Sequence, residues 1–286
     1  MTKPQRKIDA HHHLWTYTPA EFGWIDDRME ALRRDFEVDE LTREADGVGV
    51  CGTVAVQARQ TLEETRFLCG VAQCSSIMRG VVGWAPIADE GFPKIFEQMR
   101  TLPHLVGLRH VVQAEPDGFL DGRAFNAGLR HLTAVGLTYD LLVFERQLEE
   151  AIRFVDRHPK QAFVLDHVAK PRIAEGVLEP WRAHMRELAR RPNVMCKISG
   201  MVTEAKWSQW ALDTLRPYVD VCMESFGPAR LMAGSDWPVC LLASSYQRWW
   251  ETLEQYFRSF SDAERDAIFA TNAISFYRLE DQKRAA

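Results

Sequence analysis

The feature that most constrains the fold is a repeated alternation of short apolar runs with longer amphipathic stretches from one end of the chain to the other. Several of the short runs are rich in Val, Ile and Leu without strict alternation, which is typical of parallel strands covered on both faces. Eight such runs, each followed by a helical pattern, is the number that closes a (β/α)8 barrel. We therefore predict an α/β fold, a TIM barrel, with strands over 7–13, 49–57, 79–87, 106–113, 137–143, 162–168, 194–199 and 231–236.

The helical patterns and the chain length agree with a barrel. A doubly wound open sheet shares the alternation, but eight strands favour a closed sheet. A length of 286 residues fits two ordinary domains or one barrel with additions, and no linker, repeat or low-complexity segment divides the chain, so we expect a single domain over 1–286. The predicted helices cover 62–74, 91–102, 125–135, 147–157, 179–191 and 210–225, with 246–260 as the last barrel helix.

Two segments are additional to the eight strands and eight helices of a (β/α)8 barrel. The connection 14–47 is long and rich in aromatic residues, which predicts an insertion after the first strand that folds over one mouth of the barrel. The stretch 262–277 predicts an extra C-terminal helix, because Ser261 and Glu264 form a capping-box pattern at its start.

Composition excludes several classes of protein. With 46% hydrophobic and 26% charged residues the chain is neither disordered nor fibrous. A formal net charge of −5 without a basic stripe argues against nucleic acid as a partner. No run approaches the roughly 18 apolar residues of a membrane span, and the six cysteines form no CxxC pair, so we expect reduced thiols and a cytoplasmic protein.

In parallel barrels the active site gathers at the carboxyl ends of the strands, so polar residues there are the first candidates. The first strand ends Asp9-Ala10-His11-His12-His13. A side-chain period of two places Asp9, His11 and His13 on one face, where two imidazoles can converge on an ion or a substrate oxygen. A purification tag would sit at a terminus, and core packing fits one histidine better than three, so we interpret the cluster as a site.

Three other strand ends carry polar residues. Asp236 follows an apolar strand and a glycine, where it is either a helix N-cap or a functional carboxylate; the Pro238 that follows favours the second interpretation. The fourth strand ends Arg109-His110 and the sixth ends Asp166-His167. Neighbours in a strand face opposite ways, so we expect one residue of each pair to point inward, without a choice between them; a structural salt bridge is an equal alternative for Asp166.

These segments together form a recognisable pattern. Asp-Ala-His-His-His-Leu-Trp, Gly-Leu-Arg-His-Val, Leu-Asp-His-Val-Ala-Lys-Pro and Gly-Ser-Asp-Trp-Pro resemble the amidohydrolase superfamily, and more narrowly its sugar-lactonase branch, the L-fuconolactonase and L-rhamnonolactonase-like enzymes. The resemblance covers nearly the whole chain. It implies a (β/α)8 hydrolase in which His11, His13 and Asp236 form the reaction centre and His167 faces the substrate.

The chain also departs from the wider superfamily. The fourth strand lacks the lysine that bridges two metals in dinuclear members, and the fifth lacks the usual metal-binding histidine, which argues against a two-metal site. Members of this branch have an optional or loosely held metal. The resemblance therefore implies at most one Zn²⁺ on His11, His13 and Asp236, which activity need not require.

The expected reaction is the opening of an aldonolactone, such as L-fucono- or L-rhamnonolactone, to the sugar acid. Asp236 takes a proton from water placed beside His11 and His13. Arg109, His110 or a bound Zn²⁺ stabilises the oxyanion, and Asp236 or His167 returns a proton to the leaving oxygen.

Substrate binding is expected just past the strand ends. Aromatic rings there could stack on the sugar or only pack in the core, and polar side chains could bind hydroxyls. The partner is a small-molecule lactone, and the chain could be a monomer or a homodimer. The candidates are Trp15, Trp84 and Trp237 for stacking and Gln57, Arg59 and Lys170 for hydroxyls.

Other functions fit part of the pattern. A Schiff-base aldolase could use Lys197 or Lys170, but this leaves the histidines and Asp236 without a role. A metal-dependent decarboxylase of the same superfamily is closer, and a barrel that binds a ligand without turning it over is the third alternative.

Overall fold

The computed structural model describes residues 6–279, which contain a parallel eight-stranded sheet with its strands in chain order. Strand β1 lies beside β8, where the His13 amide donates to the Trp237 carbonyl at 2.6 Å. The sheet therefore curls into a barrel, which confirms the predicted (β/α)8 fold. The strands are β1 Lys7–His12, β2 Val50–Val56, β3 Met78–Gly83, β4 Leu105–His110, β5 Thr138–Leu141, β6 Phe163–Leu165, β7 Val194–Ile198 and β8 Leu231–Ala233. Residues 1–5 and 280–286, the ends of the predicted domain, lie outside the described part of the chain.

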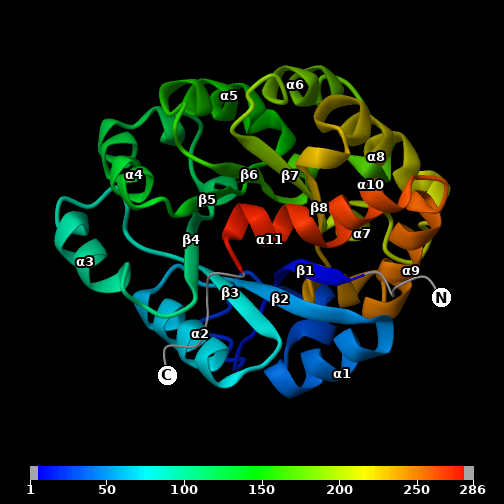
Figure 1. Cartoon of the computed structure of the whole chain (residues 1–286), viewed down its shortest axis with the longest axis horizontal. Helices are drawn as coiled ribbons and strands as arrows, with labels where there is room; N and C mark the ends of the chain where they lie inside the picture. Colours follow the sequence, from blue (N-terminus) through cyan, green and yellow to red (C-terminus); the bar gives the residue numbers. More distant parts are fainter. Residues whose placement is uncertain (1–5, 280–286) are drawn as a thin grey trace.

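Helices follow the strands and surround the barrel (Figure 1). Helix α2 has the predicted bounds, and it begins after Thr61, whose hydroxyl accepts from the Glu64 amide at 3.1 Å. The helices are α1 Val38–Val48, α2 Leu62–Cys74, α3 Phe92–Met99, α4 Arg123–Val135, α5 Leu148–Arg157, α6 Trp181–Leu188, α7 Met201–Glu204, α8 Leu212–Phe226, α9 Tyr246–Phe257, α10 Asp262–Asp266 and α11 Asn272–Tyr277.

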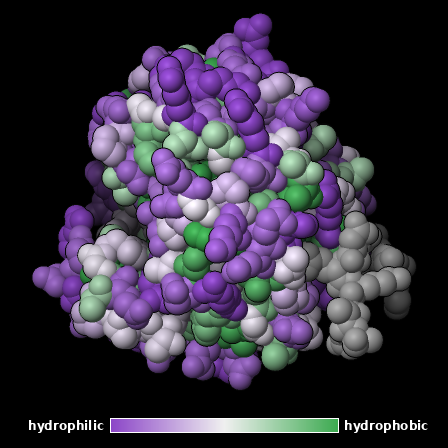
Figure 2. All heavy atoms as spheres, turned by 90° about the vertical axis from the view of Figure 1, so that its left-hand side faces the viewer, coloured by the Kyte–Doolittle hydropathy of each residue, from purple (hydrophilic) through white to green (hydrophobic). Residues whose placement is uncertain are grey.

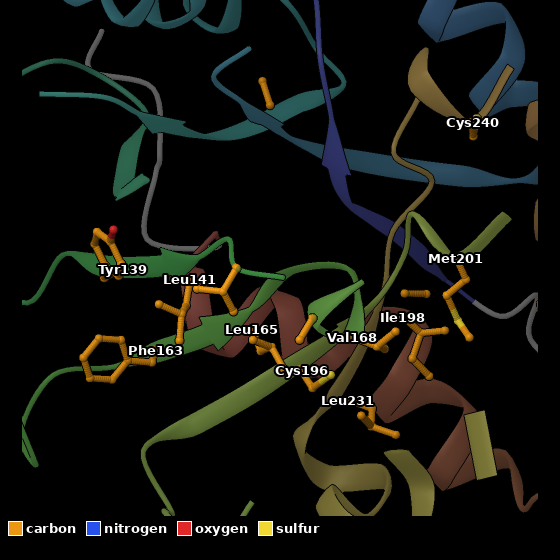
Figure 3. Packing of buried hydrophobic residues seen from close by; sticks show 14 of the residues in the cluster. Tyr139, Leu141, Phe163, Leu165, Val168, Cys196, Ile198, Met201, Leu231 and Cys240 are labelled. Atoms are coloured by element: carbon orange, nitrogen blue, oxygen red, sulfur yellow. The ribbon is translucent and has the colours of Figure 1, made fainter. Parts of the chain in front are cut away.

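One layer of the core lies between the strands and the surrounding helices. Figure 3 shows Tyr139 and Leu141 of β5 beside Leu165 of β6 and Ile198 of β7, which are buried members of this layer. The rings of Tyr139 and of Phe154 in α5 lie 6.1 Å apart at 70°. Alternate residues of each strand thus face the helices, as expected for strands covered on both sides.

A second layer fills the barrel interior near the amino ends of the strands. It is closed by α11, which crosses the middle of the barrel in Figure 1. The predicted extra helix is therefore present, as α10, a π-helical turn over Ala267–Thr271 and α11, and Ser261 and Glu264 form the predicted capping box. The layer contains Ile8, Ala10, Val54, Val56, Val82, Val106, Val164 and Met232 of the strands with Ala270, Ala273, Tyr277 and Leu279.

The insertion after β1 lies against the carboxyl mouth, as predicted. Trp15 and Phe36 pair through their backbones, and the Phe36 ring lies 5.2 Å from that of Trp237, which follows β8. Glu21 forms an ion pair with Arg59, which follows β2. The insertion thus contacts the loops of two strands and contains a 3-10 helix at Asp27–Leu32.

The face of the molecule over α3 and α4 is largely polar. Figure 2 shows the face over α3 and α4 as mostly hydrophilic, with small separate groups of hydrophobic residues. Among residues 6–279 no helix has the length and apolar character needed to cross a bilayer.

The strands are shorter than predicted where the site lies. β6 ends at Leu165 and β8 at Ala233, whereas the predicted strands extend to 168 and 236. The following polar residues leave the sheet in tight turns, so the alternation rule does not govern their direction.

Candidate active site

The end of β1 brings two imidazoles together at the carboxyl mouth. The Nε2 atoms of His11 and His13 lie 3.3 Å apart, and both rings are buried. The Nδ1 of His13 lies 2.7 Å from the Val56 carbonyl, so Nδ1 carries a proton, and Nε2 is directed into the site. The structure thus brings the two rings together, as the spacing predicts, in an edge-to-face arrangement at 79°.

Asp9 lies outside this group, and the prediction that it shares a face with the two histidines is wrong. The pairing register of β1 shifts between Asp9 and His12, which breaks the strict alternation. The Asp9 carboxylate accepts hydrogen bonds from the amide and hydroxyl of Ser235 and from the hydroxyl of Tyr246. Burial raises the pKa of Asp9 to about 6, and its role is to join β1, β8 and α9.

The end of β6 contributes two side chains rather than one. Asp166 Oδ1 lies 3.4 Å from His11 Nδ1, and the His167 ring centroid lies 4.4 Å from that of His11. The prediction that only one of the pair points inward is wrong, because residues 167–170 form a left-handed turn with φ between 47° and 58°. The Nδ1 of His167 lies 2.8 Å from the Ser199 hydroxyl, and burial lowers its pKa to about 4.

The Asp236 carboxylate lies at the centre of the site. Its Oδ1 is 3.3 Å from His13 Nε2 and 3.7 Å from the Nε2 atoms of both His11 and His167. Its backbone has a φ of 58° and is held by an amide hydrogen bond of 2.8 Å to the His11 carbonyl. Burial disfavours its charged form, but the three imidazoles outweigh this and hold the pKa of Asp236 below its usual range.

These residues fit a divalent metal ion. The donor atoms of His11, His167 and Asp236 all lie within 4.8 Å of one another, and all three residues are buried. Two ligands at about 2.0–2.1 Å from a tetrahedral Zn²⁺ lie roughly 3.3 Å apart, which matches the 3.3 Å between His13 and Asp236. The structure thus adds His167 to the predicted set of His11, His13 and Asp236.

At the end of β4, Arg109 faces the site and His110 does not. Arg109 Nη1 donates to Asp166 Oδ2 at 3.0 Å and lies 3.3 Å from His11 Nε2. The His110 ring stacks on Phe119, and its Nε2 lies 2.7 Å from Glu115 Oε1. This resolves the choice that the sequence leaves open, and it places His110 beside Glu115 rather than against His11 or Asp236.

A buried ionic network lies directly beneath His11. Lys197 Nζ is 2.5 Å from Asp140 Oδ2, 3.0 Å from Asp166 Oδ1 and 3.2 Å from His11 Nδ1. Burial disfavours the charge on Asp166, but Lys197 and His11 hold its pKa well below the usual range. At Asp140 burial prevails over Lys197 and raises the pKa to about 6, while the Tyr277 hydroxyl donates to Oδ2 at 2.8 Å.

Sequence reasoning missed this network as a unit. Asp140 and Lys197 each occupy the middle of an apolar strand, and two opposite charges in such positions are a signal for a buried pair. Asp166 joins this pair through its contact with Lys197, and it also contacts His11. The two alternatives for Asp166, a structural salt bridge and a position at the site, therefore both apply. Lys197 is fully buried among carboxylates, a setting that does not favour the accessible neutral amine of a Schiff-base enzyme.

The candidate substrate-binding residues lie in two environments. Trp15 and Trp237 are buried, and Trp15 packs against Phe22 and Phe36. Gln57 is buried too, and its Nε2 donates to the Arg109 carbonyl at 3.3 Å.

The other three candidates are partly exposed near the mouth. Trp84 donates from Nε1 to His110 Nδ1 at 3.2 Å. Arg59 pairs with Glu21, and Lys170 Nζ lies 3.8 Å from Glu204 Oε1. Stacking and hydroxyl binding by these six residues stay predictions.

Comparison with known proteins places this geometry in a family. The amidohydrolase family matches residues 8–279. An L-fucono-1,5-lactonase of Burkholderia multivorans is 40% identical over 96% of this chain and 97% of its own length. An L-fucono-1,5-lactonase of Burkholderia ambifaria is 36% identical, with 96% of each chain covered.

A solved structure supports the same relationship. A crystal structure of a Burkholderia multivorans amidohydrolase with bound zinc has a TM-score of 0.92 and 40% identity, and covers 95% of this chain and 99% of that one. The fold and the sequence similarity thus agree over nearly the full length. The chain is a hydrolase that belongs to the amidohydrolase family, in its sugar-lactonase branch.

Proposed function

We propose that this chain hydrolyses an aldonolactone to the open sugar acid, with L-fucono-1,5-lactone as the first candidate and L-rhamnonolactone as the second. The observation that carries the proposal is a buried carboxylate, Asp236, surrounded by the imidazoles of His11, His13 and His167. The similarity over 96% of the chain to two proteins named L-fucono-1,5-lactonase supports the choice of substrate.

Asp236 is proposed as the general base. The low pKa of this carboxylate keeps it ionised at neutral pH, so it is in the form that accepts a proton. Water beside His13 transfers a proton to Asp236 as its oxygen attacks the lactone carbonyl. The same low pKa makes Asp236 a weak base, and the oxyanion that forms therefore needs strong stabilisation.

Arg109 is the proposed stabiliser. It is buried and permanently charged, and its Nη1 lies 3.3 Å from His11 Nε2 while it donates to Asp166 Oδ2 at 3.0 Å. A fixed cation in a site with little water stabilises developing negative charge far more than a solvated one does. His110 is proposed for this role only second, because its Nε2 is bonded to Glu115.

Collapse of the tetrahedral intermediate breaks the bond between the carbonyl carbon and the ring oxygen. The ring oxygen takes the proton that Asp236 accepted, either directly or through His167, which gives its own proton to the oxygen as it receives that of Asp236, so both residues return to their starting states. The product is the hydroxy acid, and no proton is gained or lost at the enzyme over the cycle. A zinc ion on His11, His13, His167 and Asp236 would polarise the carbonyl and lower the pKa of a bound water.

Substrate hydroxyls are proposed to contact Gln57, Arg59 and Lys170. The Oε1 of Gln57 is buried without a hydrogen-bond partner among the described residues, so a donor from the sugar would satisfy it. Stacking of the sugar is proposed for the partly exposed Trp84 ahead of the buried Trp15 and Trp237.

A pH-indicator screen tests the proposal. The purified protein is mixed with a library of aldonolactones, with and without a chelator, and release of acid is followed. We expect rapid acidification with L-fucono-1,5-lactone or a close stereoisomer. Absence of acid release over the whole library, with and without added Zn²⁺, would contradict the proposed function.

A further inference from the structure

The Nδ1 atom of His11 has two neighbours that compete for it. Lys197 Nζ lies 3.2 Å away and Asp166 Oδ1 lies 3.4 Å away, and all three side chains are fully buried. An ammonium group only donates hydrogen bonds, and a carboxylate only accepts them. Nδ1 therefore either accepts from Lys197 or donates to Asp166, and the choice fixes which nitrogen of His11 carries the proton.

The contacts at the other edge of the ring bear on this choice. His11 Nε2 lies 3.7 Å from Asp236 Oδ1 and 3.3 Å from His13 Nε2. A carboxylate only accepts hydrogen bonds, so the contact with Asp236 is favourable when His11 carries its proton on Nε2.

Arg109 favours the other tautomer, because its Nη1 lies 3.3 Å from His11 Nε2 and can only donate. Its nearer acceptor is Asp166 Oδ2, at 3.0 Å. Lys197 at Nδ1 and Asp236 at Nε2 act against Arg109, and together they favour a ring in which Nδ1 accepts from Lys197 and Nε2–H points into the site.

A metal ion would require the opposite tautomer. Zinc bonds to the lone pair of a neutral imidazole nitrogen, so a ligand at Nε2 has its proton on Nδ1. That proton would face Asp166, and the hydrogen bond from Lys197 would be lost. The positive charge of Lys197 would also remain beside a ring that binds a cation.

We propose that Lys197 is a positioning residue that holds His11 in the Nε2–H tautomer and thereby lowers the affinity of the site for zinc, while Asp166 raises that affinity by accepting from Nδ1–H. This inference concerns the His11 ring and stands whatever the substrate is. If the proposed lactonase function also holds, the Nε2–H of the metal-free enzyme is a donor to the lactone carbonyl, so the ring serves with or without metal.

The test is the affinity of the metal-free protein for zinc, measured by competition with a chromophoric chelator. Lys197→Met removes the donor and the charge, and we expect zinc to bind at least about 10-fold more tightly. Asp166→Asn removes the carboxylate acceptor, and we expect binding roughly 10–100-fold weaker, the usual effect of losing such a partner. Damage to the fold does not tighten metal binding, so the first result separates positioning from a merely structural role.

Two further variants keep the result interpretable. Asp140→Asn combined with Lys197→Met removes the buried pair together, so it leaves no unpaired carboxylate at 140 and should bind zinc as tightly as the single variant. Tyr277→Phe removes a hydrogen bond to the same Asp140 without changing charge or touching His11, and we expect its zinc affinity to equal wild type within about 2-fold. Equal or weaker zinc binding in both Lys197 variants overturns the proposal.

Nitrogen-15 NMR of the metal-free protein gives an independent reading of the tautomer. The two ring nitrogens of a neutral histidine have distinct shifts according to which carries the proton, and His11→Asn identifies the His11 signals by their loss. We expect Nε2–H in the wild type and a shift toward Nδ1–H in Lys197→Met. An Nδ1–H signal in the wild type would refute the proposal even if the affinities moved as expected.

Discussion

The two halves of the barrel interior are built on the same eight strands but hold opposite kinds of side chain. Toward the amino ends, residues such as Val82 and Val164 pack against α11 in an apolar cluster. Toward the carboxyl ends, the interior holds Arg109, Asp166 and Lys197, which are as deeply buried as the apolar residues. The same depth of burial therefore has opposite energetic consequences in the two halves.

Burial of apolar surface stabilises a fold, whereas burial of charges costs free energy that close pairing only partly returns. The apolar packing near the amino ends thus stabilises the fold. The buried charges near the carboxyl ends reduce that stability, but they place charged groups at the site where the reaction is proposed to occur. If this division is right, substitutions in the carboxyl half should mainly change turnover, and substitutions in the amino half should mainly change the free energy of unfolding.

The largest effect is expected from the centre of the charged half. Asp236→Asn keeps the shape of the side chain but removes the proposed base, so turnover should fall by about 10³-fold, within the range of general base catalysis. Initial rates on the lactone identified by the screen measure this. The variant should still fold, because the amide has the shape of the carboxylate and can hydrogen-bond to the same imidazoles.

A rate above one tenth of wild type would show that Asp236 is not the base. Ser244→Ala is a suitable control, because this nearby hydroxyl donates only to the backbone of Ser245. Its turnover should be unchanged.

The next largest effect is expected from the apolar half. Met232→Ala empties space in a fully buried position and should lower the free energy of unfolding by about 2–5 kcal/mol. Urea unfolding measures the loss, and turnover per folded molecule should stay within about 3-fold of wild type. A large loss of turnover at temperatures where the variant is folded would contradict the division between the halves.

The apolar half was the more predictable from sequence. Val-rich runs such as 49–57 depend on burial and spacing alone, and these properties do not change with the residues of the neighbouring strands. The order of the strands and the α2 helix follow from local patterns for the same reason. Strand ends were less predictable, because β6 and β8 stop where turns begin.

The charged half was predictable only in part. His11, His13 and Asp236 could be selected, since the active site of a parallel barrel gathers at the carboxyl ends of its strands, and the family resemblance added His167. Their directions could not, because the register shift near Asp9 and the left-handed turn at 167–170 depend on contacts with other strands. The choice of Arg109 over His110 likewise depends on Asp166, which lies 57 residues away in the chain.

A third prediction concerns how the stability of the protein depends on pH, and it involves the buried carboxyl group of Glu64. Glu64 is buried and accepts hydrogen bonds from the amides of Ala58 and Arg59, and burial raises its pKa to about 7. Because the folded state then holds a proton that the unfolded chain releases above its ordinary pKa of 4.5, this group makes the protein less stable as pH rises from 4.5 to 7.

Glu64→Gln removes this titration while keeping an acceptor. The free energy of unfolding of wild type, minus that of the variant, should fall by up to roughly 1.4 kcal/mol per pH unit in this window and level off above it. Urea unfolding at several pH values measures the difference. A difference that rises with pH would mean that the carboxylate is stabilised, not destabilised, by its surroundings.

The smallest effect, and the sharpest test of the division, is expected at Tyr277, whose ring belongs to the apolar half and whose hydroxyl donates to Asp140 in the charged half at 2.8 Å. Tyr277→Phe keeps the ring packed and removes the hydrogen bond, so the free energy of unfolding should fall by about 1–2 kcal/mol, less than for Met232→Ala. Lys197 remains beside Asp140, so the network should keep its shape and turnover should stay within about 2-fold of wild type. A loss of turnover above 10-fold, measured on the same lactone, would mean that α11 acts on the reaction through Asp140 and that the two halves work as one unit.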